Sequence, residues 1–99
     1  MHEALQEILA GVAEIEAADA ARRDAFEQAV GMYINDVVDP EVGVFVWQGR
    51  IAEIQIADKF CKRDRGDVEA TLNAVIINAF EAWHSDYTRR LGASGALSA

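Results

Sequence analysis

Residues 42–56 read VGVFVWQGRIAEIQI, two runs of strand-forming residues that are separated by Gln48-Gly49. Valine, isoleucine and aromatic side chains favour extended backbone because they pack well on a pleated surface. Glycine tolerates the positive φ that a two-residue hairpin loop requires. The stretch therefore predicts an antiparallel β-hairpin, around which the rest of the fold must be arranged.

Residues 1–30 are rich in alanine and glutamate, contain no proline and carry apolar side chains at alternating steps of three and four. This spacing predicts one long helix. Its apolar stripe consists of Leu5, Ile8, Val12, Ile15, Phe26 and Ala29. Asp19 and Arg22 occupy the middle of the same stripe. Either this part of the helix passes over solvent or a loop, or the two residues meet those of a second chain and fix the register of a helix pair.

Residues 31–41 join this helix to the hairpin. Their mixture of β-branched and aromatic side chains predicts a short strand over Tyr33–Val38, although the helical stripe could equally continue to Val37. Asp39-Pro40-Glu41 then predicts a turn, because proline presets φ at the second turn position and the aspartate can bond back to the chain. The sheet is thus expected to have two or three strands.

The C-terminal part of the chain predicts a second helix. Residues 57–66 are polar and locally basic, and Asp67 follows as a candidate N-cap whose carboxylate can accept backbone N–H bonds. An apolar stripe then runs to Leu91, with two arginines in the last turn and Gly92 just beyond it, as expected for a helix end. We expect residues 92–99 to be a disordered tail.

The composition indicates one small domain, since the chain has 99 residues, of which 52% are hydrophobic, and a net charge of −8. We expect this single domain to cover residues 1–91. Cys61 is the only cysteine, which excludes an intrachain disulfide and is typical of a reducing compartment. The N-terminal residues lack the features of a signal peptide, and no stretch reaches the ~20 apolar residues that span a bilayer. We therefore expect a cytoplasmic protein without membrane contact.

Two helices and a small sheet make an α+β unit that cannot bury all of its own apolar surface. A three-stranded sheet is only ~14 Å wide, whereas the N-terminal helix would be ~42 Å long. One face of the sheet and much of the helical stripe therefore stay uncovered after the second helix has packed. A two-fold homodimer is the simplest remedy. We expect its interface on the hairpin, at Val44, Phe45, Val46, Trp47, Ile54 and Ile56.

The order of these segments resembles the YbaB/EbfC family of small bacterial nucleoid-associated proteins. The similarity rests on the long Ala/Glu-rich first helix, on the strand GRIAEIQI at residues 49–56, and on the polar link into a helix that begins DVE at 67–69 and continues LNAVIINA at 72–79. It covers about residues 5–91. The resemblance implies an α/β/α protomer, a homodimer joined through the sheets, and DNA binding without an enzymatic step.

Under this resemblance, DNA would contact the clustered basic residues. These are Lys59, Lys62, Arg63 and Arg65 in the link and Arg89 and Arg90 at the end of the second helix. Their charge could neutralise phosphates, and the protein would then be associated with the nucleoid. The same link could instead be a solvated loop whose cations offset the negative charge of Asp58, Asp64 and Asp67.

The acidity of the chain favours a different partner. Its 17 acidic residues against 9 basic ones set a negative long-range field, which repels phosphate. The first helix contributes strongly to this excess, since its only cations are Arg22 and Arg23. The alternative function is therefore an acidic protein–protein interaction module, such as a secretion accessory or regulatory adaptor, which docks a basic protein and does not bind DNA.

No motif predicts an enzyme. His2, His84 and Cys61 lack metal-ligand spacing, so we expect neither a metal nor a cofactor. His84-Ser85-Asp86 contains the residue types of a catalytic triad, but consecutive helical residues point about 100° apart. Cys61, with two basic neighbours, is either a reactive thiolate or a plain, partly buried cysteine. The aromatic residues predict core or dimer interface, with a small-molecule pocket at the dimer seam as the alternative: Phe45, Trp47, Phe80, Trp83 and Tyr87.

Overall fold

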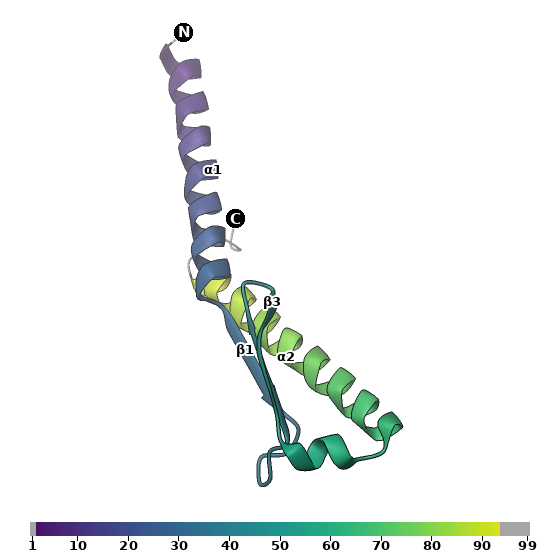
Figure 1. Cartoon of the computed structure of the whole chain (residues 1–99). Helices are drawn as coiled ribbons and strands as arrows, with labels where there is room; N and C mark the ends of the chain where they lie inside the picture. Colours follow the sequence, from purple (N-terminus) through teal and green to yellow (C-terminus); the bar gives the residue numbers. More distant parts are fainter. Residues whose placement is uncertain (1, 94–99) are drawn as a thin grey trace.

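The computed structural model describes residues 2–93, which form two α-helices and one antiparallel sheet (Figure 1). In chain order the elements are α1 (His2–Gln28), β1 (Val30–Ile34), β2 (Val42–Trp47), β3 (Arg50–Ile56), the 3₁₀ helix η1 (Asp58–Lys62) and α2 (Arg65–Ala93). The strands lie in the order β1-β2-β3, and α2 packs on β1 and β2. This is the predicted α+β arrangement, with three strands in the described sheet.

The predicted β2–β3 hairpin is confirmed. Gln48 and Gly49 form its two-residue loop, and both have positive φ, at 54° and 70°. Trp47 and Arg50 pair on either side of this loop. Positive φ at both loop positions matches the right-handed twist of the strands, which explains why glycine is useful there.

The boundary between α1 and β1 differs from the prediction. The helix ends at Gln28, so the alternative in which it continues to Val37 is wrong. The strand occupies Val30–Ile34 rather than Tyr33–Val38. It pairs with β2 from its first residue onward, and this ladder ends β1 before the two valines at 37 and 38.

A side-chain bridge explains where β1 ends. The Oδ1 atom of Asn35 accepts hydrogen bonds from the backbone N–H groups of Glu41 (2.8 Å) and Val42 (3.0 Å). These bonds close the base of the connection, so residues 36–40 leave the ladder and form the turn. Short-range hydrogen bonds from asparagine are a common way to start such a turn.

The core lies between β2 and α2. Its buried members are Val42, Val44 and Val46 from β2, Phe60 from η1, and Val75 and Ala79 from α2. Gly31 lets β1 approach the helix very closely. A Cβ atom at this position would lie 2.3 Å from the backbone nitrogen of Trp83 and 2.5 Å from the carbonyl oxygen of Ala79. Only glycine fits this backbone-to-backbone contact.

Both predicted ends of the second helix need correction. α2 begins at Arg65, because Asp64 and not Asp67 caps it: Oδ2 of Asp64 accepts the N–H of Gly66 at 3.1 Å. The helix also continues through Gly92, since one glycine costs a helix only about 1 kcal/mol. Ala93 also belongs to α2, and residues 94–99 of the predicted tail lie outside the described residues.

Most of α1 projects from the body, and we call its residues 3–24 the arm (Figure 1). The helix is held at its last turns, where Phe26 packs edge-on against Trp83 and Tyr87 with ring centroids 5.8 and 6.3 Å apart. Every arm residue is exposed or half-buried. The radius of gyration is 20.2 Å, whereas a compact domain of this length has about 13 Å. As expected, the described chain does not cover this helix.

Candidate functional site

The third strand is incompletely covered. Ile51, Ile54 and Ile56 pair with the buried valines of β2 and therefore lie on the side of the sheet that faces α2. They remain 38–44% exposed, because α2 packs on β1 and β2 and barely reaches β3. β3 is also an edge strand, and its outer edge pairs with no described strand. We call these three isoleucines and this edge the β3 flank.

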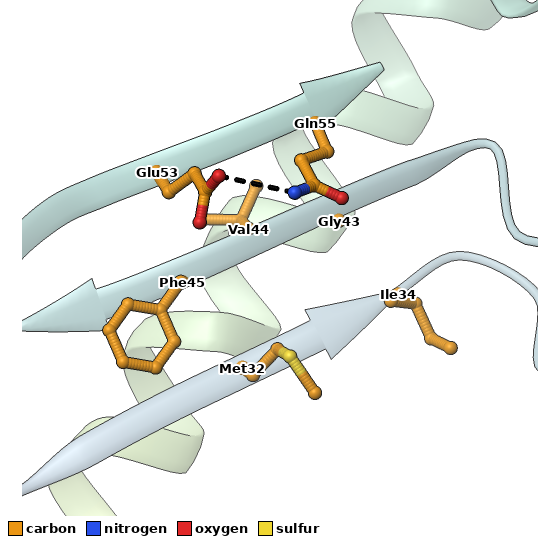
Figure 2. Close-up of a pocket in the computed structure, with 7 residues that line it drawn as sticks. All are labelled: Met32, Ile34, Gly43, Val44, Phe45, Glu53 and Gln55. Atoms are coloured by element: carbon orange, nitrogen blue, oxygen red, sulfur yellow. Dashed lines mark hydrogen bonds between the residues drawn. The ribbon is translucent and has the colours of Figure 1, made fainter. Parts of the chain in front are cut away.

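On the opposite side of the sheet, which we call the open sheet face, no helix of the described chain lies over the strands. Figure 2 shows Met32, Phe45 and Gln55 on this face, with α2 behind the strands. Glu53 lies directly across from Phe45, and its Oε1 accepts a hydrogen bond from Nε2 of Gln55 (3.1 Å). The groove between these side chains has a volume of about 140 Å³. This is well below the ~300 Å³ of small-molecule sites, so this groove is too small for a drug-sized ligand.

The structure divides the six predicted interface residues into three pairs. Val44 and Val46 are at most 1% exposed under α2, so the prediction that they contact a second chain is corrected: they belong to the core of their own chain. Ile54 and Ile56 lie on the β3 flank. The remaining two predicted residues, Phe45 and Trp47, lie on β2, where Phe45 is half-buried and Trp47 is exposed.

Trp47 also has a structural role that the sequence does not indicate. Its Nε1 atom donates a hydrogen bond to the carbonyl oxygen of Glu27 at 2.8 Å. Carbonyl groups in the last turn of a helix have no partner within that helix. The indole therefore ties the end of α1 to the hairpin and helps to fix the direction of the arm.

The arm exposes an apolar stripe on its distal half. Its members are Leu5, Ile8, Leu9, Val12 and Ile15, each 45–63% exposed. We call them the arm stripe. Asp19 and Arg22 follow on the same helical face and form an ion pair within the chain, with 2.5 Å between Oδ1 and Nη2. In the described chain these two charges are thus paired with each other.

The basic link is largely neutralised by carboxylates of the same chain. Lys59 pairs with Asp39, and this hydrogen bond raises the pKa of the lysine. Arg63 pairs with Glu41 and Asp67, which raise the pKa of the guanidinium. Arg65 pairs with Glu69 at 3.0 Å. Among the described residues, Lys62 is the one cation of the link without a carboxylate partner.

Arg63 has a structural role within this link. Its partner Glu41 is buried, and the carbonyl oxygen of Glu41 accepts the N–H of Ala57 at 2.7 Å. A buried carboxylate needs a charged or hydrogen-bonding partner. Arg63 therefore joins η1 to the 36–40 turn, and it is poorly placed to give up its partner to a phosphate.

Arg89 and Arg90 converge on Asp86 of the same helix. The carboxylate accepts hydrogen bonds from the N–H of Val30 (2.9 Å), from Arg89 (2.5 Å) and from Arg90 (3.0 Å). The Val30 N–H, followed by the two arginines, holds the pKa of Asp86 well below its ordinary value of 3.8. This group ties the start of β1 to α2. Arginines three and four residues after an aspartate are a sequence signal for such pairing, so the sequence could have indicated this structural role of Asp86.

Asp86→Asn is expected to lower the free energy of unfolding at pH 7 by about 1–3 kcal/mol, because the amide loses three charge-assisted hydrogen bonds. The folded-state pKa lies below the unfolded one, so the carboxylate stabilises the fold above the ordinary value of 3.8 and loses this effect as the pH falls. Urea unfolding at pH 7 and pH 3 should show the difference between variant and wild type shrinking at pH 3. Asp24→Asn, at an exposed arm position, is the control and should change stability by less than about 0.5 kcal/mol. Equal stability of Asp86→Asn and wild type at pH 7 would contradict this role.

Residues that carry reactive groups are spread over the described surface. Within residues 2–93, no three His, Cys, Asp or Glu side chains are placed to hold a metal ion. Cys61 is exposed rather than partly buried. His84 and Ser85 are exposed on α2, and the carboxylate of Asp86 is engaged with Val30 as described. Neither described helix is long and apolar enough to cross a membrane.

The surfaces available for recognition are thus the β3 flank, the open sheet face, the arm stripe and a partly neutralised basic link. Comparisons with protein families, with curated proteins and with solved structures find no match for this chain.

Proposed function

We propose that the chain is a non-enzymatic homodimeric binding protein whose partner is another protein. The β3 flank supports the proposed dimer, because a strand edge without a partner in the described chain coincides there with three exposed isoleucines. Exposed apolar edge strands pair readily with other strands. A two-fold axis beside β3 would pair two such edges into a six-stranded sheet and place the isoleucines of both chains side by side between the α2 helices.

The choice of a protein partner is supported by the charges. Five of the six basic residues considered for DNA contact already pair with carboxylates of their own chain. The arm, the most protruding part of the molecule, carries no cation before Arg22. Phosphate neutralisation supplies most of the nonspecific affinity for duplex DNA, so this arrangement favours a protein.

DNA is the second candidate, and two exposed cations favour it. Lys62 is exposed, and the side chain of Arg65 is 92% exposed despite its pair with Glu69. Surface ion pairs of this kind contribute little to stability and exchange easily. The order of the elements also agrees with the resemblance to the YbaB/EbfC family, which implies DNA binding.

A titration with labelled duplex DNA at about 50 and 200 mM salt separates the two candidates. The protein-partner proposal predicts a Kd weaker than about 1 µM and a weak salt dependence. Tight binding that falls steeply with salt would contradict the proposal. In that case Lys62→Glu with Arg65→Glu should abolish binding, whereas Arg22→Glu with Arg23→Glu, an equal charge change on the arm, should leave it nearly unchanged. Arg63 is kept intact in both variants because it holds the buried Glu41.

A further inference from the structure

The arm stripe has no partner among residues 2–93, and the proposed dimer would not supply one. Two β3 edges pair antiparallel only about a two-fold axis perpendicular to the sheet. Because the arm extends beyond one end of the sheet, as Figure 1 shows, this axis would direct the two arms to opposite ends of the dimer. The five apolar side chains of the stripe would then still face water.

An uncovered stripe of this kind is costly for an isolated helix. Helices in water gain most of their stability from packing an amphipathic face, and the arm packs its distal half against nothing in the described chain. From Leu5 to Ile15 the stripe is ~15 Å long, which is about three helical turns. Its 3–4 spacing is the pattern that receives the side chains of a second helix.

The charges around the stripe indicate what kind of helix fits. Between Glu3 and Asp19 the arm has five carboxylates and no basic residue, and the whole chain has a net charge of −8. Glu16 and Asp19 lie on the stripe face, at its end nearest the body, while the other three point away from it by helical periodicity. Asp19 is paired with Arg22 of its own chain, so Glu16 is the carboxylate of the stripe face that a partner can use. A second copy of the arm would double the five carboxylates around the stripe, whereas lysine or arginine beside a partner's apolar seam would meet Glu16.

We infer that the arm stripe binds a basic amphipathic helix of another protein, with the partner's apolar seam on the five stripe residues and its cations beside Glu16. This inference rests on the proposed protein-binding function and specifies its partner. The apolar seam provides the affinity, and the acidic arm provides the selectivity and a faster association.

Three designed peptides of about three heptads test the inference with the full chain. The first has isoleucine and leucine at the seam and lysine beside it, the second keeps the seam but has glutamate beside it, and the third keeps the lysines but has alanine at the seam. Fluorescence anisotropy of the labelled peptides should show at least about tenfold tighter binding of the first than of either other peptide. Equal binding of the lysine and glutamate peptides would overturn the basic partner, and no binding of any peptide would overturn the site.

Arm variants show where the peptide binds. The double variant Ile8→Asp with Val12→Asp should bind the lysine peptide at least about tenfold more weakly than the wild type. Ala10→Asp with Ala17→Asp adds the same charge to the opposite side of the helix and should change binding by less than about threefold. An equal loss of peptide affinity in both double variants would mean that the peptide does not bind at the arm stripe.

The outcome for the arm can be separated from that for the proposed function. If sedimentation shows that Ile8→Asp with Val12→Asp breaks a self-association of the wild type, the stripe pairs with a second copy and the inference is wrong. If no peptide binds, while the chain remains dimeric and does not bind DNA, only the inference about the arm is overturned. Tight, salt-sensitive DNA binding overturns the proposed function itself.

Discussion

Gly31→Ala is expected to lower the free energy of unfolding by about 3 kcal/mol or more. The added Cβ would lie 2.3 Å from the backbone nitrogen of Trp83 and 2.5 Å from the carbonyl oxygen of Ala79. Both are main-chain atoms within α2, so neither can move aside as a side chain can. β1 must then move away from the helix. Because a domain of this size is stable by only about 5–15 kcal/mol, a large share of its stability is lost.

Urea unfolding followed by circular dichroism measures this effect, at equal protein concentration because association also stabilises a folded chain. Gly11→Ala is the matched control. A Cβ at Gly11 would meet nothing within 4 Å, and the position lies inside the exposed arm helix, so alanine should stabilise it by about 0.5–1 kcal/mol. If the free energy of unfolding of Gly31→Ala is within about 1 kcal/mol of the wild-type value, β1 and α2 do not make this close contact.

Ile54→Asp is expected to weaken the homodimer by at least about 100-fold, which corresponds to about 2.7 kcal/mol. Ile54 lies in the β3 flank and is 44% exposed in the single chain, so the substitution should be tolerated by the chain itself. By symmetry the proposed dimer would bury two carboxylates close to each other without cationic partners. Sedimentation velocity over a range of protein concentrations measures the shift in the dimer dissociation constant.

Ile15→Asp is the control for this experiment, since it makes the same chemical change at an exposed isoleucine of the arm. It should leave the dimer unchanged, because the proposed dimer keeps the arms apart. If Ile15→Asp dissociates the dimer and Ile54→Asp does not, the chains associate through their arms and the role assigned to the β3 flank is wrong.

The elements that depend on local signals could be predicted from the sequence. Gln48-Gly49 between two runs of strand formers was sufficient for the hairpin, because the turn chemistry and the flanking residues agree. The long apolar stripe at residues 68–91 was similarly sufficient to predict the second helix. Its start was wrong by a few residues, since Asp64 and Asp67 are equally suitable caps by residue type and only the structure shows which one accepts the N–H bond.

The features that depend on distant contacts could not be predicted. Val44 and Phe45 are both apolar, so alternation along β2 could not show which side α2 would cover. The pairing of Arg63 with Glu41 joins residues 22 positions apart, and that of Asp86 with Val30 joins residues 56 positions apart. The family resemblance implied Arg63 as a DNA contact, whereas its buried partner Glu41 is brought to it only by the folded chain.

Sedimentation equilibrium of the wild-type chain is the most direct test of the proposed homodimer. It reports mass independently of shape, which matters for a molecule with dimensions of 73 × 21 × 16 Å. At tens of micromolar protein, we expect a species of twice the chain mass of 10.8 kDa. A single species of 10.8 kDa at that concentration would show that one chain is stable with its β3 flank exposed, and it would contradict the proposed homodimer.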